Sequence, residues 1–168
     1  VRAVSASSNV PGDEIFWAGG IKRLVGGPES SISGYTVGID NDYVSSFGLT
    51  VIAGRAFDRD HTNEAKSVMV NRAMAEALDF DQPSVAVGEK VIQGDTLEVV
   101  GVLENYHQMS LKESVVPLVF RFTPANANFI SVKVEHTNYI QVLSAIQEPW
   151  NSVFPGNPID YFVLDQFF

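Results

Sequence analysis

Short apolar segments separated by turn-forming residues run along almost the whole chain, and this pattern limits the fold more than any other feature. The segments are rich in Val, Ile and Phe, which favour strands, and Gly, Pro or Asn lies between them. Strands are expected at residues 1–7, 35–39, 49–52, 67–70, 90–92, 96–102, 117–122, 129–134 and 159–164. A Gly-containing connection of hairpin length, residues 93–95, predicts a β-hairpin in the middle of the chain.

Helical patterns are fewer. Between Asn138 and Trp150, apolar residues recur at three- and four-residue spacing, which predicts an amphipathic helix that Pro149 should end or kink. Shorter helices are expected at residues 42–47, capped by the Asp40–Asn41 pair, and at residues 72–78, capped by Asn71. Residues 17–33, rich in Gly and Ser, are expected to form a loop, and the whole pattern indicates an α+β fold.

Composition excludes several classes of function. With 168 residues and 45% hydrophobic content, the chain should form one compact body, and we expect it to have two lobes. A formal net charge of -9 argues against nucleic acids and anionic membrane surfaces as partners. The absence of cysteine excludes disulfides, thiol nucleophiles and thiolate metal sites. Both ends are expected to continue into a longer protein.

Candidate catalytic and metal sites are weak. The three histidines, His61, His107 and His136, are far apart in sequence, so no metal site or other cofactor is expected. The acidic stretch 58–64 lacks the Gly and the bidentate Glu of a calcium loop, and we interpret it as a solvated, helix-capping loop, with calcium as a minor alternative. Ser110 near His107 would need a buried acid and an oxyanion site for hydrolysis, so no catalytic residue is assigned.

The glycine pairs and the aromatic residues also favour structural interpretations. Gly19–Gly20 and Gly26–Gly27 lack the preceding strand, the following helix and the Lys-Ser/Thr pair of a phosphate-binding loop. Trp17, Trp150 and the many Phe residues are expected to belong to the core rather than to a ligand site. The Asp79 and Asp81 carboxylates are expected in a solvated turn.

Seven segments carry a further pattern through their order and spacing. They are residues 4–12 (VSASSNVPG), 42–49 (DYVSSFGL), 53–57 (AGRAF), 70–75 (VNRAMA), 87–90 (VGEK), 99–111 (VVGVLENYHQMSL) and 161–165 (YFVLD). Together they resemble the periplasmic core domain of MacB-like, FtsX-type permeases of ABC transporters, over nearly the whole chain. The run Glu104-Asn105-Tyr106-His107 departs from the Asp-Phe-His run of many relatives, while keeping a turn-and-strand character.

The resemblance implies a two-lobed domain that lies between the first and second membrane helices, on the periplasmic face of the inner membrane. One porter-like lobe, of strand-helix-strand units, would comprise residues 1–46 and 118–168, and an inserted, mainly β lobe with a short helix would comprise residues 47–117. The domain itself would be soluble and non-enzymatic. It would transmit motion driven by cytoplasmic ATP hydrolysis, for export or envelope signalling.

The implied partners are an ATP-binding subunit or domain reached through the membrane helices, a periplasmic adaptor protein or lipoprotein, and a second copy in a homodimer. We expect one loop to face a partner, because loops on a rigid scaffold often carry recognition, with the loop at 17–33 as a second candidate. The expected partner-facing residues are Tyr106, His107, Gln108, Met109, Ser110, Leu111 and Lys112. The alternative function is a periplasmic receptor or sensor that binds a peptide, lipid or drug in a cleft between lobes.

Overall fold

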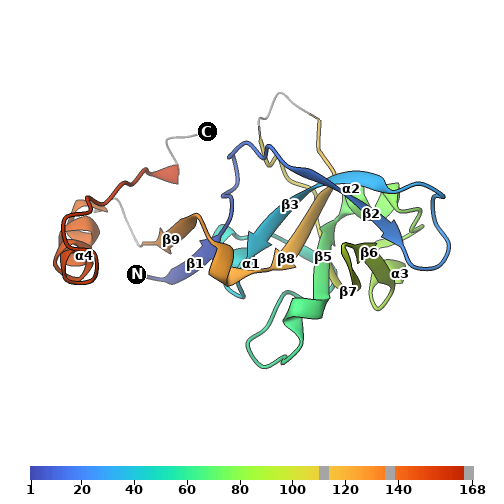
Figure 1. Cartoon of the computed structure of the whole chain (residues 1–168), viewed down its shortest axis with the longest axis horizontal. Coiled ribbons are helices and arrows are strands. Elements are labelled where there is room, and N and C mark those ends of the chain that lie inside the picture. Colours follow the sequence, from blue (N-terminus) through green and yellow to red (C-terminus); the bar gives the residue numbers. More distant parts are fainter. Residues whose placement is uncertain (110–113, 135–138, 165–168) are drawn as a thin grey trace. The chain divides into compact units, whose positions relative to one another are not determined.

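The computed structural model describes residues 1–109, 114–134 and 139–164 (Figure 1). It contains two compact units, one of residues 5–131 and one of residues 1–4 and 132–168, of which only the described parts are discussed. The chain passes between the units twice, within a strand each time. In the described residues no helix has both the length and the apolar character needed to cross a bilayer.

In the described residues, nine strands form one mixed sheet. The strands are β1 (Ala3–Ser7), β2 (Ala18–Arg23), β3 (Ile32–Ile39), β4 (Val51–Gly54), β5 (Ser67–Asn71), β6 (Lys90–Gln93), β7 (Asp95–Leu103), β8 (Leu118–Phe122) and β9 (Phe129–Lys133). Figure 1 shows β3, β8 and β5 side by side, with β3 parallel to β8 and β5 antiparallel to it. The hairpin predicted around residues 93–95 is confirmed as β6 and β7.

Strand β2 closes the sheet into a ring. Its first residues pair with β3, from Ala18 opposite Tyr35 to Ile21 opposite Ile32, and its last two pair with β6. The pairings therefore run β2-β6-β7-β5-β8-β3 and return to β2. The sequence interpretation of residues 17–33 as a loop is wrong for this part, because Gly19 and Gly20 take part in strand pairing despite their low strand propensity.

Two apolar cores lie on the two faces of this sheet. Helices α2 (Arg72–Ala77) and α3 (Pro83–Ala86) contribute to the first core, and helix α1 (Tyr43–Phe47) contributes to the second. All five residues of β5 are buried, as expected for a strand covered on both faces. The first core contains Ile21, Val68, Val70, Met74, Leu78, Val91, Leu97, Val99, Val102 and Val119 among others. The second contains Val37, Ile39, Tyr43, Phe57, Met69, Leu103, Leu118 and Phe120 among others.

Asn71 caps α2 as the sequence predicts, and it also joins α2 to β8. Its side-chain oxygen accepts from the backbone N–H groups of Met74 and Leu118, both at 2.9 Å. Its amide donates to the carbonyl of Val116 at 2.8 Å. Asn71 is fully buried, and these bonds give both its side-chain oxygen and its side-chain nitrogen a partner.

The second unit contains α4 (Tyr139–Val153), the predicted amphipathic helix, which continues past Pro149 for one turn. At the end of α4, the ring of Trp150 lies 4.7 Å from that of Phe154, the residue after the helix, and the Trp150 indole donates to the carbonyl of Asn157. The strand predicted at residues 159–164 is wrong, because residues 159–163 adopt no regular structure. Its apolar and aromatic residues favour a strand, but strand formation also requires backbone pairing, which the composition does not specify.

The α+β class is confirmed by this sheet and its short helices. The predicted lobes, divided at residues 46/47 and 117/118, remain a prediction. Both dividing points fall inside the unit of residues 5–131, and β5 and β8 pair across the second of them.

Candidate functional site

The described part of the predicted partner-facing loop, residues 106–109, is held against the rest of the larger unit. Tyr106 and His107 are half-buried and Gln108 is only 1% exposed. Ser110, Leu111 and Lys112 lie outside the described residues. The partner-facing role of the loop therefore remains a prediction, and the described part of the loop shows what fixes it in place.

Gln108 ties this loop to the turn at residues 10–13. Its side-chain amide nitrogen donates to the carbonyls of Val10 at 2.8 Å and Asp13 at 3.2 Å, and its backbone carbonyl accepts from the N–H of Gly12 at 2.7 Å. The Tyr106 hydroxyl donates to the side-chain oxygen of Gln108 at 2.6 Å. A buried amide with all of these partners holds two distant segments in a fixed register.

Tyr106 also belongs to the core below the loop. Its ring lies 6.4 Å from that of Phe120, and burial raises the pKa of its phenol well above the ordinary range. Burial likewise raises the pKa of Tyr43. Both phenols are therefore neutral at physiological pH, and their role here is to support the loop rather than to transfer protons.

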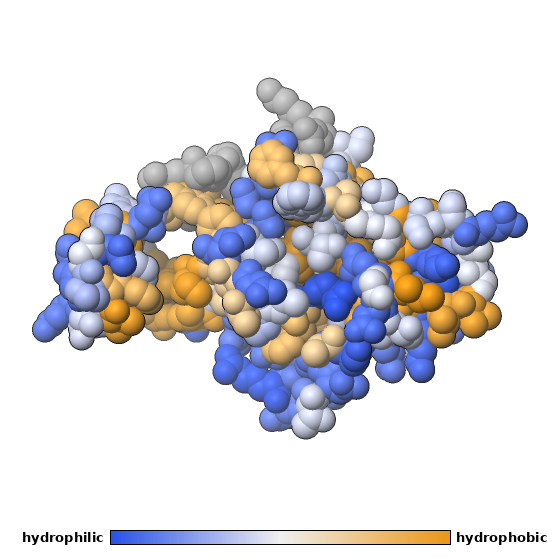
Figure 2. All heavy atoms as spheres, viewed as in Figure 1, coloured by the Kyte–Doolittle hydropathy of each residue, from blue (hydrophilic) through white to orange (hydrophobic). Residues whose placement is uncertain are grey.

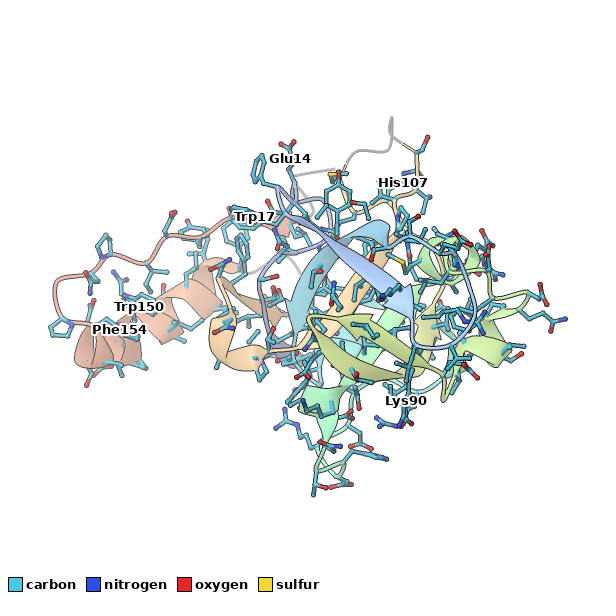
Figure 3. The ribbon with its side chains drawn as sticks, turned by 45° about the vertical axis from the view of Figure 1, so that its right-hand side comes forward. Glu14, Trp17, Lys90, His107, Trp150 and Phe154 are labelled. Atoms are coloured by element: carbon cyan, nitrogen blue, oxygen red, sulfur yellow. The ribbon has the colours of Figure 1, made fainter. Side chains whose placement is uncertain are left out.

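Two large aromatic side chains project next to this anchor. Phe16 is 79% exposed and Trp17 is 84% exposed, while the preceding Ile15 is buried in the second core. Figure 3 shows Trp17 on the segment before β2 and His107 on the segment after β7. The expectation that Trp17 belongs to the core is wrong, and a hydrophobicity pattern alone could not reveal that these residues are exposed.

Glu104 and Asn105, which depart from the family pattern, hold the start of α2. The Arg72 guanidinium binds the Glu104 carboxylate through two bonds of 2.9 and 2.8 Å, and this lowers the pKa of Glu104 to about 2. Asn105 accepts from the N–H of Ala73 at 2.9 Å. The two residues therefore have a structural role.

The acidic stretch 58–64 is a hydrophilic projection, visible at the bottom of Figure 2. Its last residue, Glu64, is buried, contrary to a fully solvated loop, and it accepts from Arg55 at 2.6 Å and from the N–H of Asp58 at 2.8 Å. Burial opposes ionisation of Glu64, but these hydrogen bonds outweigh it and lower its pKa. The carboxylate is thus already paired with an arginine, an arrangement that disfavours calcium.

The described histidines form no common site. His61 is exposed beside Asp58, the partially exposed His107 has a buried Nδ1 atom, and His136 and Ser110 lie outside the described residues. Within the described ranges, no three His, Asp or Glu side chains are grouped in a way that could hold a metal ion.

One polar recess was missed by the sequence interpretation. It has a volume of about 610 Å³ and lies entirely within the unit of residues 5–131. This cavity is referred to as the recess. Its lining consists of Ser8, Gly19, Gly20, Thr36, Gly38, Gln93, Gly94, Arg121, Thr123 and Asn126. The one feature of the sequence that could have indicated this recess is Arg121, a charged residue in the otherwise apolar strand LVFRF.

Three solved structures have a fold similar to that of this chain. The periplasmic region of MacB from Actinobacillus actinomycetemcomitans matches with a TM-score of 0.62 at 13% identity, over 91% of this chain and 67% of that one. The extracellular domain of the noncanonic ABC-type transporter YknZ from Gram-positive bacteria matches at 0.60 and 22% identity, over 84% and 70%. A domain of a putative permease from Porphyromonas gingivalis matches at 0.58 and 11% identity, over 99% and 82%.

The fold is therefore that of extracytoplasmic domains of transporter permeases. The sequence model of the MacB-like periplasmic core domain matches residues 2–148, and the chain belongs to this family. It is a periplasmic domain of a MacB-like ABC transporter permease, a class of transporter with ATP-binding partners. No curated protein matches the chain significantly.

Proposed function

We propose that this domain transmits ATP-driven motion of the permease to the periplasm. The observation that supports this is the course of the chain: both ends belong to the smaller unit, and only β1 and β9 lead into the larger one. If the membrane helices adjoin the two ends, as the resemblance implies, their motion enters through these ends. Strands transmit displacement better than flexible loops, because their backbones are held by paired hydrogen bonds.

The larger unit is built to move as one body. Its sheet is covered by apolar cores on both faces, and Gln108 and Asn71 join distant segments through buried hydrogen bonds. Close-packed interiors deform little, so displacement of β1 and β9 would move the whole unit and the loops on it.

Spin-label distances in the full transporter test this proposal. Labels are placed at Gln147→Cys in α4 and Thr62→Cys in the larger unit, both exposed positions, in a transporter from which any cysteines outside these 168 residues have been removed. The distance distribution should differ between nucleotide-free and ATP-trapped transporter. A control pair within the larger unit, Thr62→Cys with Glu29→Cys, should not change. Identical distributions for the first pair in both states would reject the proposal.

Docking of a periplasmic adaptor or lipoprotein, and pairing with a second copy, belong to the same proposal. Phe16 and Trp17 support docking, because exposed aromatic residues on an anchored loop have the character of interface hot spots. Trp17→Ala should reduce cross-linking of the transporter to its partner protein while leaving ATP hydrolysis by the whole transporter intact. The domain itself is expected to be non-catalytic.

A further inference from the structure

The recess lies on the same face of β8 as part of the first core, but it has the opposite character. Side chains alternate along a strand, so Val119, Arg121 and Thr123 share one face. Val119 belongs to the first core, whereas Arg121 and Thr123 line the recess. On β3, Thr36 and Gly38 are paired with Val119 and Arg121 and share their face. The apolar filling of the ring thus ends where the recess begins.

We propose that the recess binds a phosphate group, with Arg121 as its charged donor. Four other arginines form ion pairs with carboxylates: Arg23 with Glu89, Arg55 with Glu64, Arg59 with Asp42, and Arg72 with Glu104. Among the described residues, no carboxylate lies within salt-bridge distance of Arg121, although the chain carries an excess of acidic side chains.

The guanidinium of Arg121 is partly desolvated and forms no direct ion pair among the described residues. Its hydrogen bonds are two long contacts of 3.4 Å, from Nη1 to the carbonyl and the side-chain oxygen of Gln93. The Asp95 carboxylate nearby is engaged with the Lys66 amine at 2.5 Å. Loss of hydration lowers the pKa of Arg121, and the opposing attraction of Asp95 does not outweigh it. A bound anion would supply a direct counter-ion.

Neutral donors surround this cation from several segments. Thr36 accepts from the Gln93 amide at 2.9 Å, which leaves its own hydroxyl proton free to donate. The hydroxyl of Thr123 and the amide of Asn126 also line the recess, and no acidic side chain does. A tetrahedral phosphate accepts many hydrogen bonds from different directions, and arginine binds it through two parallel bonds.

The glycines make room for such a group. Gly19, Gly20, Gly38 and Gly94 line the recess without side chains of their own. This arrangement differs from a phosphate-binding loop at a helix start, because the donors project from strands and turns around a cavity. The recess lies within the unit of residues 5–131. Its lining includes Gln93 and Gly94 from the predicted inserted lobe, and the other residues come from the predicted porter-like lobe.

Titration of the 168-residue chain with inorganic phosphate, followed by calorimetry and ³¹P NMR, tests the proposal. We expect saturable binding that weakens about tenfold in Arg121→Gln, the loss of one charge-assisted hydrogen-bonding group. Arg59→Gln removes the same charge from an exposed position outside the recess and should leave the affinity within about twofold. Absence of saturable binding, or equal weakening by both variants, would overturn the proposal.

Further variants separate binding from folding and phosphate from other anions. Thr123→Val removes one donor without changing the charge and should weaken phosphate binding severalfold. This second variant tests the proposal even if Arg121→Gln does not fold. Acetate should compete poorly with phosphate; equal competition would overturn the choice of phosphate.

Sedimentation with phosphatidylglycerol and phosphatidylcholine vesicles distinguishes a lipid headgroup from a soluble phosphate as the source of the ligand. If free phosphate binds, Arg121-dependent binding to phosphatidylglycerol vesicles but not to phosphatidylcholine vesicles assigns the phosphate to a lipid headgroup. Binding of free phosphate with no binding to either vesicle assigns it to a soluble ligand.

Discussion

At one end of β3 and β8, Gly34 and Val119 face packed apolar side chains, whereas two to four residues further along Gly38 and Arg121 face the recess. The same two strands, in the same register, therefore build a core at one end and a solvent-open polar site at the other. The difference comes from side-chain chemistry at a few positions, because backbone pairing is continuous through both. It implies that substitutions at the core end should change stability, and those at the recess end should change binding.

The largest effect is expected at Asn71. Asn71→Ala removes the cap of α2 and leaves the buried N–H of Leu118 and the carbonyl of Val116 without their partner. The cost should be about 3 kcal/mol, from the cap and from the unpaired groups. Asn126→Ala, at the recess, is the matched control and should cost less than about 0.5 kcal/mol. Urea unfolding of both variants measures the difference, and similar midpoints would contradict the distinction between the two ends.

The buried ion pair Arg55–Glu64 gives the next largest effect. Glu64→Gln should lower the free energy of unfolding by about 2 kcal/mol, a buried-pair value reduced because Arg55 is partly exposed. The pKa of Glu64 is lowered on folding, so the ionised group stabilises the protein above its ordinary pKa of 4.5. That contribution is lost as the pH falls below this value. Thermal melts from pH 7 to pH 3 should show a smaller acid destabilisation in Glu64→Gln than in the unmodified chain.

Two glycines of β3 offer a closer comparison. A Cβ at Gly34 would lie within overlap distance of the Met74 methyl in the packed core, and one at Gly38 within overlap distance of the Thr123 hydroxyl at the recess. Gly34→Ala should cost about 1 to 2 kcal/mol as overpacking, and Gly38→Ala less, because Thr123 can rotate toward the recess. Melting temperatures decide the order, and a larger loss for Gly38→Ala would mean that the recess is as tightly packed as the core.

Some elements of the fold can be predicted from the sequence, and others cannot. The β6–β7 hairpin and the Asn71 cap follow from local rules, and both were predicted. The pairing of Gly19 and Gly20 in β2 was missed, because a glycine-rich segment becomes a strand only when another strand lies beside it.

The candidate sites depended even more on tertiary structure. Gln108 is polar and lies in a loop, so nothing in its neighbours indicates that it is buried against the turn at 10–13. Arg121 interrupts an apolar strand, which marks it as unusual, but seven of the other nine residues of the recess come from distant segments. Their meeting is set by the β2–β3 and β3–β8 registers, which single-sequence patterns do not specify.

The smallest expected effect on stability is that of Arg121 itself. Arg121→Gln removes a partly desolvated charge whose hydrogen bonds are long, so the free energy of unfolding in phosphate-free buffer should change by less than about 0.5 kcal/mol. Arg55→Gln, in contrast, leaves Glu64 buried with its partner weakened and should cost more. Denaturant unfolding of the two variants compares a cation that holds the fold together with one that is available for a ligand. If Arg121→Gln destabilises the chain as much as Arg55→Gln does, then Arg121 is part of the framework, and the distinction between the core end and the recess end fails at its central residue.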